Sequence, residues 1–323
     1  MLTKTFARDI LIFMHKMNSH GNMTSFQQKI ALYLRYARCC LIYVLTGKRM
    51  PPELRGNVRQ WVFYSVLKPR YATFIRKQPL LRNETHEYSD IVWWCWLQGE
   101  ENAPPVVQAC LASLRKHLSG KKIIVLTEEN LWDYARFPEY IVTKYRKGII
   151  SKAHFADLLR LQLLAERGGT WIDSTVLCTG FPGYLFNTPL FAFKEKERGD
   201  PAIAASNWLL AAEKNNPVIR LTRDLLFLYW KKNTTTYHYF IFHFFFTMAA
   251  EKYREEWDAV PFFSNLPPHI LQRELFAPYT EERFRQICRM SDIHKLTHKY
   301  DKERNTQGTF LAHILTPGGT NDA

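Results

Sequence analysis

Three polar residues are spaced so that they could act together on one substrate. In the segment "HFADLLRLQLLAERGGTWIDSTV" (154–176), Asp157 and Arg160 are three residues apart, and Asp173 follows a short apolar run. Residues three apart on a helix share a face, and the surrounding leucines make this face partly buried. Buried charges are costly unless they are paired or have a function. A structural ion pair and a catalytic role both remain open for Asp157 and Arg160.

Asp173 suits a carboxylate that holds a divalent cation together with phosphate groups. Mg²⁺ and Mn²⁺ need few protein oxygens, because phosphate oxygens and water complete their octahedral shell. His294 is a candidate second ligand, and Lys295 could neutralise charge on a departing nucleotide. The plainer interpretations are a structural aspartate at the end of a strand and a solvated His-Lys pair in the tail.

The elements that must position these residues form an alternating pattern. A strand is expected over 91–97 and a helix from 105 to 118, followed by a strand over 123–127. This order predicts a βαβ unit in a parallel sheet, where ligands bind at the carboxyl ends of the strands. The residues that follow the two strands, Gln98, Gly99, Thr127 and Asn130, should therefore lie at the site-bearing edge.

A further helix of about fifteen residues should carry Asp157 and Arg160. Ser151 is its expected N-cap, and the pair Gly168 and Gly169 its expected C-terminal stop. The next strand, "TWIDSTV", then presents Asp173 at its end.

Tryptophans of the first strand could stack on a nucleobase. Trp93, Trp94 and Trp96 alternate between the two faces of that strand, so at least one of them should belong to the core. The histidines His238 and His243 lie in an aromatic helix, where packing in the core or beside an acceptor groove is the favoured interpretation.

The positive charge of the chain is concentrated near its start. Of the net charge of +14 over 323 residues, residues 1–85 contribute fifteen Lys and Arg against three acids, which gives +12. A basic, amphipathic helix expected over 26–45 would suit an anionic membrane surface, although an ordinary core-facing helix fits the same pattern. Nucleic-acid binding is the weaker alternative, since no module for it is recognisable.

The cysteines and the hydropathy indicate a cytoplasmic protein. The six cysteines show no CxxC pair, which favours reduced thiols. No signal peptide or membrane-spanning run is expected, because the longest uncharged stretch near the start, Cys39 to Gly47, is about half of what a span requires.

Taken together, four segments resemble the bacterial capsular polysaccharide synthesis proteins. These are "WWCWLQGEENAP", "LTEEN", "HFADLLRLQLLAERGGTWIDSTV" and "IHKLTHKY", and the resemblance covers about residues 90–300. The family is related to the sugar transferases that carry a DxD motif. The most specific part is the D-x-x-R helix, the glycine pair and the strand-end aspartate in fixed order.

This resemblance implies a GT-A fold, a nucleotide-sugar donor and a divalent metal. The matching positions imply that Asp157 and Arg160 contact the donor, that Asp173 is the metal-linked acid, and that Trp93 or Trp96 lines the base pocket. His294 and Lys295 would lie near the diphosphate. Where the wider superfamily has its second aspartate, this chain has Thr175, so weaker metal binding or another ligand, such as Asp292, is expected.

The sequence therefore predicts an α/β protein with two parts. A basic helical segment (1–85) would associate with the membrane, and a GT-A domain (86–323) with a mixed, mainly parallel sheet would follow. The expected function is a retaining sugar transfer from a nucleotide-diphosphate sugar to a lipid-linked glycan of a surface polysaccharide, at the inner face of the cell membrane. The alternative is a non-catalytic scaffold or regulator that keeps the fold.

Overall fold

A computed structural model of the chain describes residues 34, 52–80, 86–194, 202–301 and 303–316. Its strands are β1 (Ile91–Cys95), β2 (Lys122–Leu126), β3 (Gly169–Ile172), β4 (Val176–Cys178), β5 (Leu190–Lys194), β6 (Ala205–Ala212) and β7 (Ile293–Lys295). Its α-helices are α3 (Pro52–Arg76), α4 (Pro105–His117), α5 (Leu131–Tyr134), α6 (Glu139–Arg146), α7 (Lys152–Arg167), α8 (Pro217–Lys232), α9 (Ile241–Lys252), α10 (Arg254–Ala259), α11 (Ile270–Arg273), α12 (Glu281–Met290) and α13 (Phe310–Leu315). Three short 3₁₀ turns are η1 (Glu100–Asn102), η2 (Gly183–Leu185) and η4 (Pro267–His269).

The central sheet has five strands in the order β2-β1-β3-β6-β5. Strand β1 pairs in parallel with β2 and β3, whereas β6 pairs antiparallel with β3 and with β5. It follows that β6 alone runs against the other four, so the mixed, mainly parallel α/β sheet expected from the sequence is confirmed. The carboxyl ends of β2, β1, β3 and β5 therefore lie at one edge, where ligands bind in such sheets.

A separate two-stranded antiparallel ladder joins β4 to β7 beside the end of β3. Val176 pairs with Lys295, and Cys178 pairs with Ile293. This ladder brings the C-terminal part of the chain next to the strand-end aspartate.

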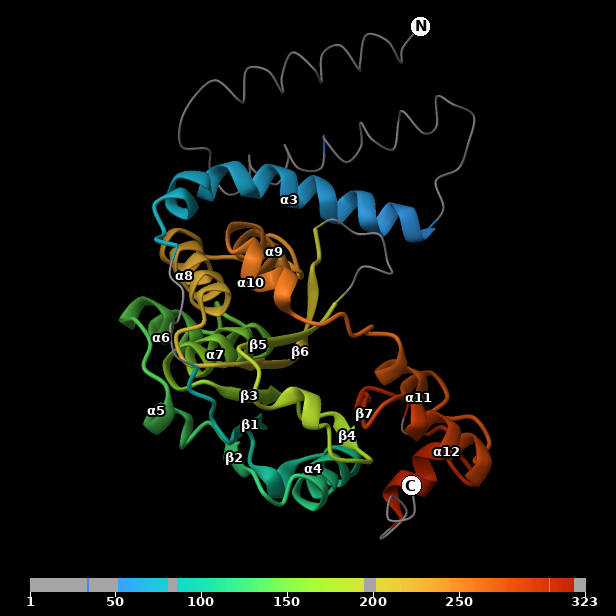
Figure 1. Ribbon diagram of the computed structural model, residues 1–323. Helices are drawn as coiled ribbons and strands as arrows, with labels where there is room; N and C mark the ends of the chain where they lie inside the picture. Colours follow the sequence, from blue (N-terminus) through green and yellow to red (C-terminus); the bar gives the residue numbers. More distant parts are fainter. Residues whose placement is uncertain (1–33, 35–51, 81–85, 195–201, 302, 317–323) are drawn as a thin grey trace, which may run out of the picture.

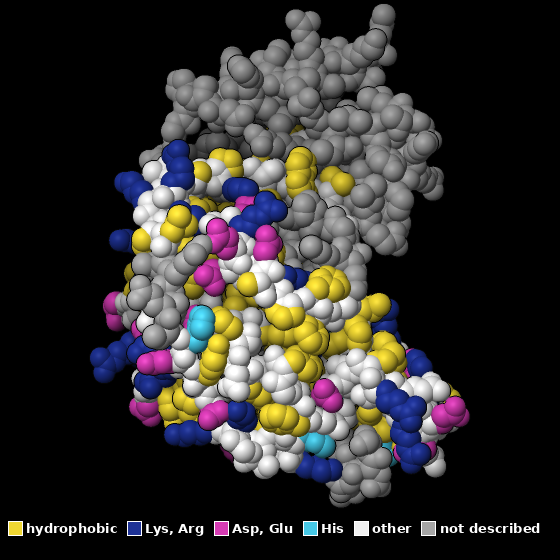
Figure 2. Space-filling model, in the orientation of Figure 1, with side chains coloured by type: hydrophobic (Ala, Val, Ile, Leu, Met, Phe, Trp, Pro, Cys, Tyr) yellow, Lys and Arg dark blue, Asp and Glu magenta, His cyan; other side chains and the backbone are white. Residues whose placement is uncertain are grey.

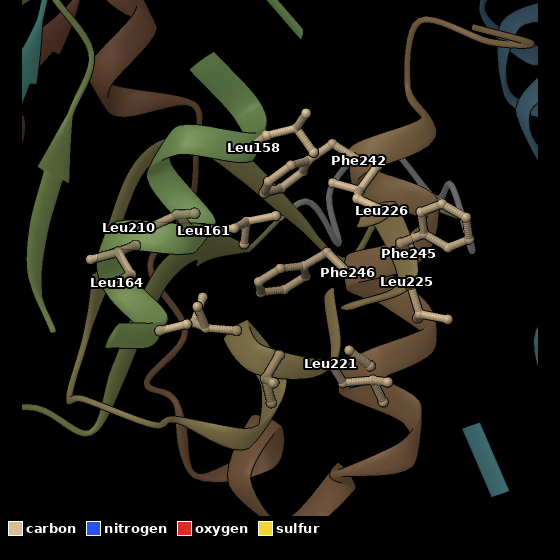
Figure 3. Packing of buried hydrophobic residues seen from close by; sticks show 14 of the residues in the cluster. Leu158, Leu161, Leu164, Leu210, Leu221, Leu225, Leu226, Phe242, Phe245 and Phe246 are labelled. Atoms are coloured by element: carbon tan, nitrogen blue, oxygen red, sulfur yellow. The ribbon is translucent and has the colours of Figure 1, made fainter. Parts of the chain in front are cut away.

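Helices cover both faces of the sheet (Figure 1). One face carries α7, α8 and α9, whose leucines and phenylalanines interdigitate in the larger core (Figure 3). The other face carries α4 with α11, α12 and α13, which form the second core. Burial of apolar surface on both faces, at about 25 cal/mol per Å², is what holds the strand ends in place.

Local signals account for α7, the helix that positions the charged residues. The Ser151 hydroxyl accepts a hydrogen bond from the backbone amide of His154, and Gly168, with a φ of 66°, ends the helix. The expected cap, stop and length are confirmed, and so is the strand-helix-strand order of β1, α4 and β2.

Part of the predicted basic segment belongs to the folded body. Helix α3 packs on α9, and Phe63, Tyr64, Leu67 and Tyr71 are buried in the larger core. The helix predicted over 26–45 lies outside the described residues apart from Leu34, so its membrane role and the predicted boundary at 85 stay predictions.

The described residues contain no membrane-spanning helix, and the face seen in Figure 2 carries charges of both signs. None of their helices combines the length and the apolar character that a span needs. On the face shown in Figure 2, basic and acidic side chains are interspersed over the body, in keeping with the small net charge beyond residue 85. The four cysteines that the structure describes, Cys95, Cys110, Cys178 and Cys288, are free thiols.

Candidate functional site

A charged cluster lies at the carboxyl end of the central strand β3. Asp173 follows this strand directly, and its backbone amide donates to the carbonyl of Trp208 on β6, at 2.9 Å. Its Oδ1 accepts hydrogen bonds from Trp171 Nε1 at 2.9 Å and from Arg160 Nη2 at 3.2 Å, and its Oδ2 lies 3.0 Å from Lys295 Nζ. With 24% of its side chain exposed, Asp173 remains within reach of a ligand.

Two cations from distant segments hold the Asp173 carboxylate in its charged form. Burial by itself would raise the pKa of this carboxyl, but the charges of Lys295 and Arg160, with the hydrogen bonds from Trp171 and Lys295, bring its pKa below the usual value. Asp173 is therefore an anion over the whole physiological range of pH.

Arg160 links the two carboxylates of the cluster. Its Nη2 lies 3.2 Å from Asp173 Oδ1 and 3.5 Å from Asp157 Oδ1, and only 6% of its side chain is exposed. Its Nη1 donates to the backbone carbonyl of Asn207, and its guanidinium lies 5.0 Å from the centre of the Trp171 ring. A buried guanidinium with this many partners is fixed in one orientation.

Asp157 has two further partners that the sequence analysis did not single out. Asn207 on β6 donates from Nδ2 to Asp157 Oδ1 at 2.9 Å, and Nδ1 of His154 lies 3.3 Å from Asp157 Oδ2. A sequence signal for His154 existed, because His154, Asp157 and Arg160 follow each other at intervals of three on α7. No sequence pattern indicated Asn207, because only the pairing of β3 with β6 brings it next to Asp157.

Lys295 reaches the cluster from β7. Besides Asp173, its Nζ donates to the hydroxyl of Thr175 at 2.6 Å, and 19% of its side chain is exposed. Thr175, the residue at the position of the second acid in the DxD pattern, thus binds a lysine here.

His294, the predicted second metal ligand, is turned away from Asp173. Neighbouring residues of a strand point to opposite faces, so Lys295 faces the cluster and His294 faces the protein interior. The His294 ring is fully buried, with Nε2 3.0 Å from the Thr179 hydroxyl, and burial lowers its pKa to about 3. In this arrangement His294 does not join Asp173, which corrects the expected metal pair.

The described residues do not fit the divalent metal that the resemblance implies. Both oxygens of Asp173 are engaged by cationic side chains, and Lys295 Nζ occupies the position between Asp173 and Thr175. Across the described part of the chain, no three His, Cys, Asp or Glu side chains gather in a way that would hold a metal. We therefore derive no step from a metal, and metal dependence stays a prediction.

The residues predicted at the ends of β1 and β2 do lie at the same edge as Asp173. The backbone amide of Glu128 donates to the carbonyl of Leu97 at 3.0 Å and joins the two loops. Asn130 closes its own turn, since it accepts from the amide of Thr127 and donates to the carbonyl of Val125. The Asn130 side chain is therefore occupied within its own turn. Backbone groups of Thr127 and Asn130 and of the Gln98-Gly99 turn could contact a donor at this edge.

Trp96, which directly follows β1, is an aromatic residue that remains accessible at this edge. It is half-buried, and its ring makes an edge contact with His298 at 5.4 Å between centroids. Its buried indole nitrogen has no hydrogen-bond partner among the described residues. A ring in this position suits the predicted base pocket.

Three predicted donor contacts lie away from this edge. Trp93 is fully buried and donates from Nε1 to the carbonyl of Gly168, so it supports the glycine turn and offers no surface to a ligand. Gly168 precedes β3 and Gly169 begins it, whereas Asp173 follows it. Four strand steps, or about 13 Å, therefore separate Gly169 from Asp173. The glycines serve the backbone instead, because a Cβ on Gly169 would approach the carbonyl oxygen of Ile91 to 2.5 Å.

Fold and site together define an α/β protein with a charged cluster at the carboxyl edge of a mainly parallel sheet. A model of the family described as capsular polysaccharide synthesis protein matches residues 52–314, and the chain belongs to this family. The matched range includes α3. No match was found among curated proteins.

Among solved structures, the chain is similar to one described as "PaToxG Glycosyltransferase". The similarity has a TM-score of 0.37 and 17% sequence identity, and it covers 61% of this chain and 79% of the other.

Proposed function

We propose that the protein transfers a sugar from a nucleotide-diphosphate donor to a hydroxyl of a glycan. The observation that carries this proposal is the exposed part of Asp173, fixed at the sheet edge by Arg160 and Lys295. A carboxylate whose pKa is shifted by specific charged partners, and which lies at the edge of the sheet where ligands bind, is a candidate functional group. The expectation from the family that this chain acts on capsular polysaccharide supports the same function.

In this proposal each side chain has a defined task. The Lys295 ammonium neutralises charge that develops on the diphosphate, and this preorganised charge accelerates transfer. The buried Arg160 guanidinium holds Asp157 and Asp173 in position. The Asp173 carboxylate and the Asp157 carboxylate accept hydrogen bonds from hydroxyls of the donor. His154 and Asn207 hold Asp157 in place through the contacts described above.

The transfer itself needs no oxidant, reductant or co-reactant. The bond between the anomeric carbon and the diphosphate oxygen breaks, and its electron pair goes to that oxygen. The acceptor hydroxyl forms the new bond to the anomeric carbon, and its proton passes to the leaving diphosphate. We propose that both events occur on one face of the sugar, with retention of configuration, and NMR of the new glycosidic bond would reveal inversion if this is wrong.

The proposal also covers the acceptor glycan and the cellular location of the protein. A lipid-linked glycan at the anionic inner face of a cell membrane would suit the basic residues 1–85. Flotation of the full chain with anionic and neutral vesicles tests this part, and equal recovery with both kinds of vesicle would contradict it.

Donor hydrolysis tests the activity before any acceptor is known. Wild type and Asp173→Asn would be incubated with UDP-, GDP- and CMP-sugars in Mn²⁺, in Mg²⁺ and in EDTA. We expect release of one nucleotide, slower by about 100- to 1,000-fold in the variant, which is the usual effect of removing one preorganised polar group. Release that survives EDTA would show that the side chains carry the charge without metal.

A result with no release and no nucleotide binding from any donor would contradict a transferase. It would favour the non-catalytic scaffold, for which Asp173→Asn should leave function in cells unchanged. Circular dichroism of the variant is the control that the chain still folds.

A further inference from the structure

A cavity of about 260 Å³ opens beside the charged cluster and has no role in the proposal above. It lies between the end of β5, the 3₁₀ turn η2 and the junction of α12 with β7. Among its lining residues are Tyr184, Phe193, Phe263, Arg289, Ser291 and Asp292. Two other hollows in the described residues hold about 20 Å³ each, which leaves no room for more than a water molecule.

The chemistry of the lining suits a hydroxyl-rich ring. The Tyr184 and Phe263 rings stack on each other at 4.7 Å and present apolar surface. Arg289 is exposed, and the partly buried Asp292 carboxylate lies against Gly180. Aromatic surface combined with a few polar groups is the usual composition of a small-molecule site.

The cavity lies on the side of Asp173 opposite to the donor residues. The sheet order puts the ends of β2 and β1 on one side of β3, and the end of β5 two strands away on the other. At about 4.8 Å per strand, the cavity wall at Phe193 is roughly 10 Å from Asp173.

One chain of direct contacts joins the cavity to the cluster. The Trp208 carbonyl accepts from the Asp173 amide, and the Trp208 ring stacks on Phe193 at 4.9 Å. A ligand in the cavity would thus approach the reaction centre from the side that the donor leaves free.

We infer that this cavity binds a sugar residue of the acceptor glycan, with Asp292 and Arg289 bonded to its hydroxyls and the Tyr184-Phe263 wall against its ring. This inference rests on the proposed function and adds the location and chemical class of the second substrate. The cavity volume is slightly below the range of about 300–1,000 Å³ for drug-sized ligands, so one sugar ring fills it.

Saturation-transfer NMR with a panel of methyl glycosides tests the inference on the full chain. We expect at least one glycoside to receive saturation from the wild type, and binding to weaken about tenfold in Asp292→Asn and in Arg289→Ala, as for loss of one charge-assisted hydrogen bond. Arg285→Ala is the matched control, because Arg285 is exposed on the same helix and outside the cavity lining.

Donor hydrolysis measured on the same preparations separates this inference from the proposed function. Normal hydrolysis with no glycoside binding, or with binding that the two cavity variants leave unchanged, would overturn the cavity assignment and keep the transferase. Cavity-dependent glycoside binding without hydrolysis of any donor would keep the sugar site and contradict the transferase. A third variant, Phe263→Ala, repeats the test without altering any charge.

Discussion

Helix α7 takes part in two regions of opposite character. Leu158, Leu161 and Leu164 pack against α8 and α9 in the larger, apolar core (Figure 3). One turn before Leu161 and Leu164, Asp157 and Arg160 enter the cluster around Asp173. The core gains free energy from burying apolar surface, whereas the cluster must offset the desolvation of each charge with paired contacts.

The core and the charged cluster should therefore respond differently to substitution. Removing volume from the core should unfold the protein without altering its chemistry. Removing the charge of Lys295 should alter the chemistry before it alters stability, because Lys295 and Asp173 are partly exposed and water still reaches them.

The largest effect on stability is expected from Phe245→Ala in α9. Phe245 is fully buried and contacts Tyr71 and Tyr229 edge-on, so its loss leaves a cavity that costs about 3–5 kcal/mol. Urea unfolding followed by fluorescence measures this change. Donor turnover per folded molecule should stay at the wild-type value, and a fall in turnover at full folding would show that the core also shapes the site.

A smaller effect, confined to activity, is expected from Lys295→Met. The variant keeps an unbranched side chain, one atom shorter, but removes the ammonium from Asp173 and Thr175. A hydrogen bond to a charged group is worth about 1.5–3 kcal/mol, so turnover should fall by about 10- to 100-fold. Lys299→Met, an exposed neighbour in the same segment, is the control. Equal turnover of both variants would remove Lys295 from the mechanism.

The smallest effect is expected from His294, the neighbour of Lys295 in β7, and it concerns the dependence of stability on pH. Since burial lowers the pKa of His294 to about 3, its ring is neutral in the folded protein, and the unfolded chain binds the extra proton below about pH 6.5. The contribution of His294 to the free energy of unfolding is therefore fully present above pH 6.5 and is lost as the pH falls toward 3. His238 and His243, with pKa values lowered by burial to about 4, act in the same direction.

Thermal unfolding between pH 7 and pH 4.5 measures this dependence. In His294→Gln the melting temperature should fall less steeply with decreasing pH than in the wild type, while donor turnover at pH 7 is retained. An unchanged slope would mean that His294 is accessible to protons in the folded state, as a ligand at the charged cluster would be.

Much of the local structure could be predicted from short stretches of sequence. The periodic leucines and the Ser151 cap define α7, and the apolar runs define β1 and β2, because these elements depend on neighbours in the chain. The position of Asp173 at the end of a buried strand follows from the same kind of signal. The D-x-x-R spacing correctly placed Asp157 and Arg160 side by side.

Other features of the site could not be predicted because they depend on distant contacts. Gly168 and Gly169 are close to Asp173 in sequence, yet the length of β3 carries them to the opposite edge of the sheet. Trp93 and Trp96 are both candidates for a base pocket by sequence, and only the tertiary packing shows that Trp93 is fully buried in the larger core whereas Trp96 is half-buried beside the second core. Asn207 enters the cluster solely through strand pairing.

The sequence by itself determined the family, the alternation of strands and helices, and the carboxylate at the end of β3, since these are written in local patterns and a fixed order of motifs. Only the tertiary structure decided which cation meets that carboxylate. Lys295 lies 122 residues away, and the register of β4 with β7 turns it, rather than His294, toward Asp173. A shift of one residue in that register would exchange the two, because neighbouring side chains of a strand point to opposite faces.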